Sequence, residues 1–473
     1  MHLVWLRNDL RLADNPALFF AAQSARQDKK PLQALFCTAP DQWQLQGDAP
    51  EKLGLQQQAL NDLQPRLNAL GITLVILQGS DFRSCAALLR SHAEKHGATD
   101  LWYNNEIPFF EQQRDTLVEA EMAATGVTTH RFEADLLLPP ELMKNQQGGW
   151  YKVFTPWYRR WTQYLDQVRD LLPDPAAIGE PVGQQGNLCL PGSEPHRQDL
   201  WPATEAAAQE SLTRFCAERL HHYSERRDIP SINGTSTVSP YLASGLISAR
   251  QCLQAVQEHS SQWRSDPWLR EVAWREFYRY LMAGFPFLSR NQPFKPETRA
   301  LQWEHNPALV NAWQEGRTGF PIVDAAMRQL LQTGWMHNRL RMITASFYTK
   351  LMLEHWQSGE HYFMSRLVDG DFPSNNGGWQ WCASSGCDAS PWFRVFNPVK
   401  QSEKFDPEGR FIRRFVPELA SVEGKAIHDP PAALREHLGY PAPVIDYRAA
   451  RERVLERFRG LQEMAAAESG RRT

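Results

Sequence analysis

The 473-residue sequence lacks the features that mark membrane and secreted proteins. No run approaches the roughly 18 consecutive apolar residues that a membrane-spanning helix requires. The N-terminus enters the short apolar run 3–6 at once, without the basic segment, longer apolar segment and cleavage site of a secretory signal. We therefore expect a cytoplasmic protein with no membrane partner.

Cysteine patterns typical of metal and redox sites are also absent. The seven cysteines form no CxxC pair, and none is spaced with histidine as zinc ligands are. We expect the cysteines to be reduced, buried small residues, and we expect no bound metal.

The sequence has no excess of positive charge. Its 51 Lys and Arg residues stand against 54 Asp and Glu residues, which gives a net charge of −3. A basic excess is typical of proteins that bind nucleic acid, but a local basic groove is sufficient. Composition therefore neither predicts nor excludes a DNA partner, and the more unusual feature is the 17 tryptophans.

The glycine-rich turn G-x-G-x-x-G, which binds dinucleotides, does not follow the first predicted strand. A dinucleotide would therefore have to bind elsewhere in the chain. Short apolar runs alternate with helical stretches at about 16–27, 51–70, 82–96 and 108–124, which predicts βαβ units and a doubly wound parallel sheet. The predicted strands are residues 3–6, 32–37, 72–77, 101–103 and 127–132.

The remaining chain divides into a linker and a helical region. Residues 172–205 are rich in Pro, Gly and Gln, and helical periodicity without strand patterns begins at about 206. We predict an α/β N-terminal domain with a doubly wound parallel sheet over 1–135, an interdomain linker over 136–205 and an all-α C-terminal domain over 206–473. We expect a monomer.

The stretch 268–279 brings a carboxyl group close to a large flat ring. On a helix, Glu271, Trp274, Arg275 and Tyr278 share one face. Burial against aromatic rings favours a protonated carboxyl group, which can donate a hydrogen bond to a carbonyl. The alternative is an ordinary amphipathic helix with Glu271 in a salt bridge.

Three further stretches carry residues suited to binding. A helical face with Trp335, Asn338, Arg339 and Met342 offers an amide for a base edge and a guanidinium for a phosphate, although an ordinary polar helix end fits too. Residues 369–381 place two acids, two amides and glycines in what we predict to be a loop that lines a site, although a turn-rich surface loop fits too. The hydroxyl groups of 234–239 suit phosphates, or they merely cap a helix.

These stretches occur together in an order that resembles the photolyase/cryptochrome family. The resemblance covers nearly the whole chain, from residues 3–12 through 151–156. It is densest at 274–278, 335–339 and 375–381, which read WREFY, WMHNR and NNGGWQW. The chain is most similar to the class I enzymes of bacteria that repair cyclobutane pyrimidine dimers.

The resemblance implies that the helical domain holds FAD, in agreement with the missing glycine-rich turn. Arg341 is then expected to pair with Asp369, and Asn375 to face flavin N5. The cofactor-binding residues implied are Tyr223, Thr235, Ser236, Thr237, Val238, Ser239, Arg341, Asp369, Gly370, Asp371 and Asn375.

The resemblance also implies a substrate, UV-damaged DNA with a flipped-out pyrimidine dimer. Photoexcited reduced FAD would pass an electron to the dimer, with Glu271, Asn338 and Asn375 in catalytic roles. The residues implied for DNA and substrate binding are Glu271, Trp274, Arg275, Asn338, Arg339, Met342, Trp381, Arg394, Gln401 and Lys404.

Two further expectations follow from the resemblance. Trp303, Trp356 and Trp379 match the tryptophans through which the family reduces oxidised flavin in light, although each taken alone fits core packing. A second, antenna chromophore, first a methenyltetrahydrofolate, would contact Phe110 and Glu111. Phe110 stands where folate-binding relatives have Asn, so a deazaflavin or no antenna is also open.

A cryptochrome-like blue-light photoreceptor is the first alternative function, and a dark flavoprotein or redox carrier that merely shares the fold is the second. Cryptochromes usually carry a long C-terminal extension, whereas this sequence ends soon after its last predicted helix. Plant cryptochromes have Asp and animal ones Cys at the position of Asn375, so this asparagine favours repair.

Overall fold

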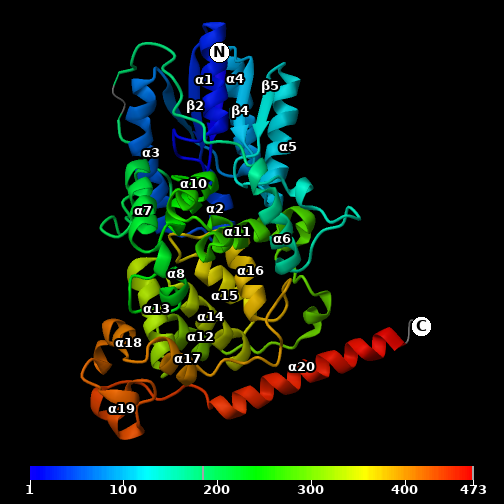
Figure 1. Ribbon diagram of the computed structural model, residues 1–473. Coiled ribbons are helices and arrows are strands. Elements are labelled where there is room, and N and C mark those ends of the chain that lie inside the picture. The colour runs from blue at the N-terminus through cyan, green and yellow to red at the C-terminus, as the bar shows by residue number, and fades with distance from the viewer. Residues whose placement is uncertain (184–185, 471–473) are drawn as a thin grey trace. The chain divides into compact units, whose positions relative to one another are not determined.

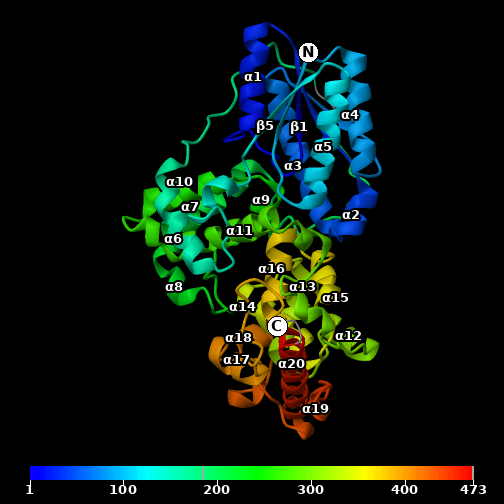
Figure 2. The ribbon, with the colours of Figure 1, turned by 90° about the vertical axis from the view of Figure 1, so that its right-hand side faces the viewer.

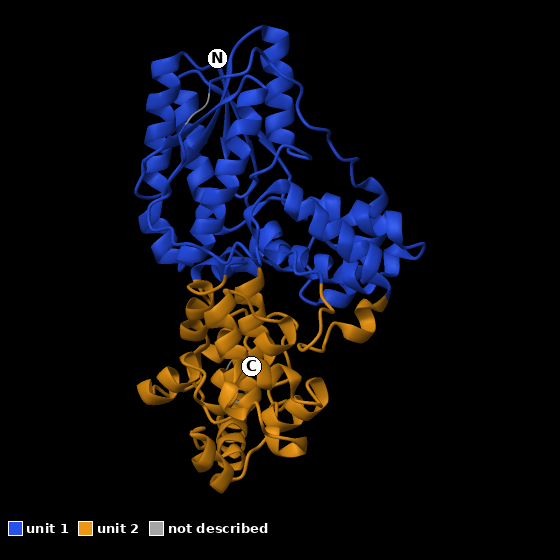
Figure 3. Ribbon diagram, turned by 90° about the vertical axis from the view of Figure 1, so that its left-hand side faces the viewer, with its two compact units in different colours: residues 1–221, 236–290, 368–373 blue, residues 222–235, 291–367, 374–473 orange. Residues whose placement is uncertain are grey.

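A computed structural model describes residues 1–183 and 186–470 of the chain. Residues 184–185 of the predicted linker and residues 471–473 of the C-terminal tail lie outside the described residues. The chain divides into two compact units, each made of three chain segments (Figure 3). Unit 1 contains residues 1–221, 236–290 and 368–373, and unit 2 contains residues 222–235, 291–367 and 374–473.

Unit 1 is built on a five-stranded parallel sheet in the order β3-β2-β1-β4-β5. In register, Val4 of β1 lies beside Ala34 of β2 and Trp102 of β4. The strand order reverses between β1 and β4, which is the switch point where doubly wound sheets bind ligands. The strands are β1 (His2–Leu6), β2 (Leu32–Cys37), β3 (Thr73–Leu77), β4 (Asp100–Asn104) and β5 (Thr128–Phe132), which confirms the five predicted strands.

Helices cover both faces of this sheet, because a parallel sheet of Val, Leu and Trp must bury both of its faces. Alternate residues such as Leu3 and Trp5 form one core with the helices α4 and α5. Figure 2 shows the strands between this pair and α1 on the other face. The covering helices are α1 (Pro16–Asp28), α3 (Pro50–Ala69), α4 (Phe82–His96) and α5 (Phe109–Ala124), close to the predicted bounds.

Unit 1 also contains helices outside the sheet. The predicted linker includes α6, which begins at Phe154 and packs against α11. The contact-based division of the chain does not follow the boundaries at 135 and 205, so those domain boundaries stay a prediction. These helices are α2 (Pro40–Gln46), α6 (Phe154–Tyr164), α7 (Glu205–Glu218), α9 (Ser239–Ser244), α10 (Ala249–His259) and α11 (Pro267–Gly284).

Unit 2 is helical, and the described part of it has no strand beyond the isolated bridge of Glu304 with Glu354. Its core surrounds Trp313, Phe347 and Trp379, which are at most 2% exposed. Figure 1 shows the helices by label. They are α8 (Tyr223–Arg226), α12 (Pro307–Gln314), α13 (Pro321–Thr333), α14 (Asn338–Ser346), α15 (Trp356–Met364), α17 (Pro398–Phe405), α18 (Arg410–Phe415), α19 (Ala432–Leu438) and α20 (Tyr447–Gly470), with a π-helical turn at Phe347–Leu351.

Two local predictions were wrong. Residues 369–381, predicted as a loop, are helical from Phe372, because α16 spans Phe372–Cys382. Proline is tolerated in a first helical turn, and burial of Trp379 in the core offsets the weak helix propensity of the glycines. Trp335 was predicted on the helix of Asn338, but α14 begins only at Asn338 because His337 caps it.

The described residues can be compared with the predictions of no membrane-spanning helix, no metal site and buried cysteines. No helix among residues 1–183 and 186–470 is both long and apolar enough to cross a membrane. The same residues contain no cluster of three His, Cys, Asp or Glu side chains that fits a metal ion. Six of the seven cysteines are buried as predicted, whereas Cys189 is exposed.

Candidate functional site

Helix α11 of unit 1 presents the predicted carboxyl and indole on one face. Asp266 caps the helix by accepting a hydrogen bond from the backbone N–H of Trp268 at 2.8 Å. Glu271 and Trp274 are partly exposed, while Val272 and Ala273 on the opposite face are buried. The predicted amphipathic face is therefore present.

The indole of Trp274 has a fixed orientation. It stacks on the ring of Phe154 at the start of α6, with ring centroids 3.7 Å apart and planes 6° from parallel. The guanidinium of Arg270 lies 5.5 Å from the Phe154 ring centroid, on the neighbouring turn of α11. This support leaves the indole preorganised to receive a flat partner.

An ion network anchors the next turn of α11. Arg275 donates to a carboxylate oxygen of Asp135 at 2.6 Å, and Arg279 donates to the other at 2.6 Å and to Asp371 at 2.5 Å. Burial alone would raise the pKa of Asp135, but the two guanidinium groups hold it below its usual range. Burial disfavours the charged form of Arg279, yet the two carboxylates more than offset this and raise its pKa.

The predicted cofactor residues of unit 1 meet at the start of α9. Ser239 Oγ donates to Asp369 Oδ2 at 2.6 Å, and Asp369 is 5% exposed. Thr237 has a left-handed φ of 55° and donates from its hydroxyl to the carbonyl of Ser236 at 2.7 Å. Hydroxyl groups beside carboxylates form a donor and acceptor set that fits the polyol and phosphates of FAD. Val238 is buried beside them, and Gly370 joins the two acids in the chain.

In unit 2, α14 displays the predicted DNA contacts. Asn338 is exposed, with its Nδ2 4.0 Å from Met342 Sδ. Arg339 donates to Asp228 at 2.8 Å, and its guanidinium lies 4.5 Å from the ring centroid of Phe405. Arg339 is therefore already paired with Asp228 of the same unit. This ion pair fixes the direction of the guanidinium group, and the carboxylate offsets part of the positive charge that a DNA phosphate would meet.

Arg341, from the same helix, donates through Nε to the carbonyl of Met336 at 2.8 Å. Its predicted partner Asp369 belongs to unit 1, so that ion pair stays a prediction. The same holds for the convergence of the FAD residues of unit 2, Tyr223 and Thr235, with those of unit 1.

Asn375 is held by a neighbouring acid. Its Nδ2 donates to the backbone carbonyl of Glu360 at 2.9 Å and to Glu360 Oε1 at 3.1 Å. Burial raises the pKa of Glu360 to about 7, although the hydrogen bond from Asn375 partly opposes this. The amide oxygen of Asn375 thereby keeps a defined direction as an acceptor.

The three predicted electron-transfer tryptophans lie around the start of α15. Trp356 begins the helix and is 2% exposed. Trp379 packs directly on Gly359, where an added Cβ would lie 2.3 Å from the indole edge. Trp303 is partly exposed, and its ring lies 5.4 Å from that of His355, the residue that caps α15. The sequence alone could not have placed these side chains around one helix.

The remaining predicted DNA contacts lie in the C-terminal part of unit 2. Trp381 is partly buried in α16, and Gln401 is partly buried in α17. Arg394 and Lys404 are exposed, as phosphate contacts must be. The buried ammonium of Lys350 donates to the carbonyls of Arg394 at 3.0 Å and Pro391 at 3.4 Å, and burial lowers its pKa to about 8.

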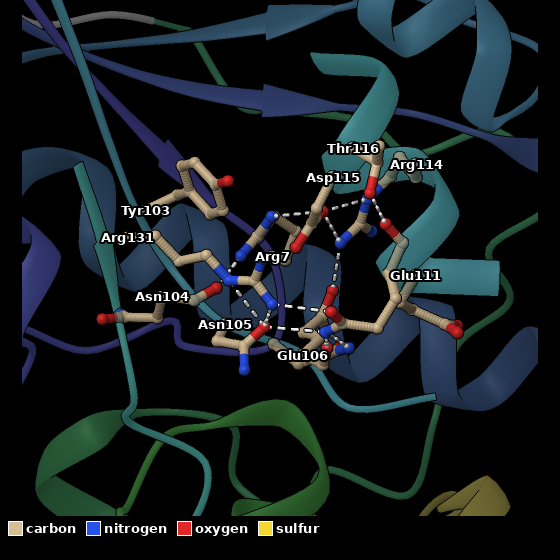
Figure 4. A network of polar contacts seen from close by, with 12 residues as sticks. Arg7, Tyr103, Asn104, Asn105, Glu106, Glu111, Arg114, Asp115, Thr116 and Arg131 are labelled. Carbon is tan, nitrogen blue, oxygen red and sulfur yellow. Dashed lines mark hydrogen bonds and ion pairs between the residues drawn. The ribbon is translucent and has the colours of Figure 1, made fainter. Parts of the chain in front are cut away.

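Glu111, one of the two predicted antenna residues, is drawn in the network of Figure 4. Glu111 Oε1 accepts from Gln46 at 2.7 Å, and burial, with repulsion from Glu106, raises the pKa of Glu111 to about 7. Phe110 offers only an apolar ring at the neighbouring position. In the same network, Arg114 pairs with Glu106 at 2.6 Å and with Asp115 at 2.7 Å.

Four supporting residues were missed by sequence reasoning. Arg279 follows Arg275 by one helical turn, so its place on that face was predictable. Phe154 belongs to the stretch 151–156, but nothing in the sequence pairs it with Trp274. Asp228 and Glu360 are distant in sequence from the side chains that they hold, so no local pattern indicates them.

Comparison with known proteins identifies the family of the chain. A family model described as "DNA photolyase" matches residues 2–177, and a second, described as "FAD binding domain of DNA photolyase", matches residues 268–460. The chain is 42% identical to the deoxyribodipyrimidine photo-lyase of Vibrio cholerae, over 97% of this chain and 99% of that protein.

Two solved structures share the fold. A class III photolyase from Agrobacterium tumefaciens has a TM-score of 0.85 and 33% identity, covering 98% of each chain. A cryptochrome from Synechocystis sp. also has a TM-score of 0.85, with 26% identity over 96% of this chain and 98% of that one.

An α/β unit with a parallel sheet, followed by a helical FAD-binding region, defines a photolyase-type flavoprotein. The chain belongs to the DNA photolyase family, and its cofactor is FAD.

Proposed function

We propose that this protein repairs cyclobutane pyrimidine dimers in DNA with light, as a deoxyribodipyrimidine photo-lyase. The observation that carries the proposal is the 42% identity, over nearly the whole of both chains, to a protein of that name. The fixed indole of Trp274 beside Glu271 on α11 supports it, because this pair offers a stacking surface and a hydrogen-bonding carboxyl group.

The substrate is damaged duplex DNA with the dimer turned out of the helix. Enzymes that act on a base within a duplex extrude it first, photolyases among them, and a damaged pair costs less to unstack. Trp274 and Trp381 cover the rings of the dimer, while Asn338 and Met342 contact its edges. Arg275, Arg339, Arg394, Gln401 and Lys404 contact the DNA backbone around it.

FAD bound by the predicted cofactor-binding residues would supply the light-driven one-electron chemistry of dimer splitting. Glu271 donates a hydrogen bond to a pyrimidine carbonyl, where negative charge develops. Asn338 holds the base edge in register, and Asn375, fixed by Glu360, presents its amide oxygen to an N–H of the cofactor.

Cofactor binding falls to hydroxyl and carboxylate side chains of the chain. Ser236, Thr237 and Ser239 suit the phosphates and polyol, and Asp369 and Asp371 suit hydroxyl groups. Tyr223, Thr235, Val238, Gly370 and Arg341 complete the proposed set. Trp303, Trp356 and Trp379 pass electrons that restore the reduced cofactor.

A cryptochrome-like photoreceptor is the second candidate, favoured by the Synechocystis structure with its TM-score of 0.85. Its identity of 26% is lower than the 33% of the Agrobacterium photolyase, which matches as well in structure. Repair is therefore the better supported function.

The proposal also covers the oligomeric state, the location in the cell and further cofactors. We propose a monomer that acts in the cytoplasm and needs no metal. A second chromophore, first a methenyltetrahydrofolate, would lie against Phe110 and Glu111.

The test uses the reduced holoenzyme with UV-irradiated oligothymidine under blue light, and a dark control. Recovery of thymine absorbance in light, lost in Glu271→Ala and Trp274→Ala, is the expected result. Light-driven reduction of the flavin without any recovery would overturn repair in favour of the photoreceptor.

A further inference from the structure

His355 connects two of the tryptophans around α15. Its ring centroid lies 5.4 Å from that of Trp303 at an interplanar angle of 53°, and 6.3 Å from that of Trp356 at 26°. Among the described residues, His355 is the one whose ring contacts both indoles. An aromatic ring in this position affects both the spacing of the indoles and the charge between them.

The local structure favours a neutral imidazole. His355 Nδ1 accepts a hydrogen bond from the backbone N–H of Gln357 at 3.3 Å and so caps α15. Protonation would place a hydrogen on Nδ1 and abolish this cap. Burial acts in the same direction, because it lowers the pKa of His355.

The titratable neighbours of Trp303 and His355 in the chain are Glu304, His305 and Glu354. Glu304 and the exposed His305 belong to the stretch that carries Trp303, and Glu304 is paired with Arg453 of α20 at 3.3 Å and Arg457 of α20 at 3.9 Å. The third is Glu354, whose buried carboxyl group accepts a hydrogen bond from the backbone N–H of Asn306 at 2.6 Å.

Glu304 is therefore compensated by guanidinium groups. Three further groups of the described chain could titrate near the tryptophans: the exposed His305, Glu354, whose pKa is raised by burial, and Glu360 of α15, whose pKa is raised to about 7. A test must separate these groups from His355.

We propose that His355 is a positioning residue for electron transfer from Trp303 to Trp356, and that protonation of its ring slows this transfer. The inference rests on the proposed electron-transfer role of the three tryptophans and adds to it a residue and a control by pH.

The step is a one-electron transfer. An electron leaves Trp303 for oxidised Trp356, which becomes neutral, and Trp303 becomes the radical cation. His355 gains and loses no electron. Positive charge thereby moves from a ring 6.3 Å from the imidazole to one 5.4 Å away, so an imidazolium opposes the step by Coulomb repulsion.

The experiment follows tryptophan oxidation in the FAD-loaded protein by transient absorption after a light flash, across the histidine titration range. The yield of oxidised Trp303 in the wild type should fall about twofold between about pH 8 and pH 5, as the two ring distances imply at an effective dielectric constant of about 20. His355→Phe, which keeps a ring but cannot be protonated, should show no such dependence. His355→Asn, which keeps a cap without a ring, should be slow at every pH.

Three matched variants and a second readout complete the test. His305→Asn, Glu354→Gln and Glu360→Gln should keep the pH dependence of wild type. Histidine ring NMR of the protein, compared with that of His355→Phe, should give a titration for His355 that coincides with the loss of yield. A dependence that persists in His355→Phe, or disappears in Glu354→Gln or Glu360→Gln, would overturn the inference.

Failure of the proposed function would look different. If Trp379→Phe did not affect the flash-induced signal, the tryptophan path itself would be wrong. If protein reduced chemically with dithionite repaired no dimers, the proposed repair would fail, whatever the behaviour of His355.

Discussion

The guanidinium of Arg279 joins the carboxylates of Asp135 and Asp371, donating to them at 2.6 and 2.5 Å. Asp135 follows the last strand of the sheet, whereas Asp371 belongs to the short segment 368–373 that returns to unit 1. This contact therefore fixes that segment, which also carries Asp369, one of the proposed cofactor ligands.

Replacing Arg279 by Met should destabilise the protein by about 3–5 kcal/mol, because two partly buried acids would lose their shared partner. Urea unfolding measures this, and FAD retention after gel filtration should fall in parallel. The matched variant Arg275→Met leaves Arg279 with both acids and should cost less. Equal losses in the two variants would show that Arg279 has no special bridging role.

The stack of Phe154 on Trp274 predicts a selective loss of substrate affinity. Phe154→Ala frees the indole, and since such stacking contributes about 0.5–1.5 kcal/mol, the Kd for UV-damaged DNA should rise roughly 3- to 10-fold. Fluorescence anisotropy with damaged and intact oligonucleotides measures this. Phe154→Tyr, which keeps the stacked ring, is the control, and an equal loss for intact DNA would contradict the interpretation.

The contact between Gly359 and Trp379 predicts how electron transfer through Trp303, Trp356 and Trp379 responds to a small change in packing. In Gly359→Ala the new Cβ would meet the Trp379 ring at 2.3 Å, so the ring must move. We expect slower light-driven reduction of the flavin and about 1–3 kcal/mol lower stability. Gly460→Ala in α20, where an added Cβ meets nothing within 4 Å, should leave the reduction rate unchanged. Equal rates in both variants would contradict the placement of Trp379.

Glu360 predicts a pH dependence of stability. Its ordinary pKa of 4.5 is raised to about 7 by burial, so between these values the folded state holds a proton that the unfolded state has lost. Stability should therefore fall as pH rises through this range, by about 3 kcal/mol from this residue. Glu360→Gln should flatten the curve measured by urea unfolding at a series of pH values. Glu456→Gln, at an exposed position of α20, should not; a curve of unchanged slope in Glu360→Gln would refute the assignment.

The buried Lys350 supports a segment that carries a proposed DNA contact, so its replacement should weaken DNA binding. Its ammonium holds the carbonyls of Pro391 and Arg394, and it is 1% exposed. Lys350→Met releases the segment that carries Arg394, so affinity for damaged DNA should fall about 3- to 10-fold. Lys425→Met, at an exposed position, is the control for lost charge. Unchanged affinity in Lys350→Met would show that the segment needs no such support.

The sheet and most helices of unit 1 were predictable, because parallel strands buried on both faces are continuous apolar runs separated by periodic helices. Propensity failed at residues 369–381, where three glycines indicated a loop but packing of Trp379 stabilises a helix. The start of α14 was missed by three residues, since a capping histidine leaves little local signal.

For the site, sequence identified the residues that carry chemical groups but not those that orient them. Trp274 and Asn375 could be identified because they belong to the motifs at 274–278 and 375–381. Their supports, Phe154 and Glu360, are 120 and 15 positions away and contact them only in the folded chain. Long-range contacts of this kind have no periodic signature that a single sequence reveals.

The return of segment 368–373 to unit 1 has a consequence during synthesis. Asp371 leaves the ribosome 92 residues after Arg279, and Asp369 leaves it 130 residues after Ser239. At about 5–20 residues per second, Arg279 waits roughly 5–20 s for its second acid. Meanwhile the helices of unit 2 up to α15 emerge, so nascent chains stalled before residue 368 should display a sheet domain whose cofactor ligands are incomplete and should retain no flavin.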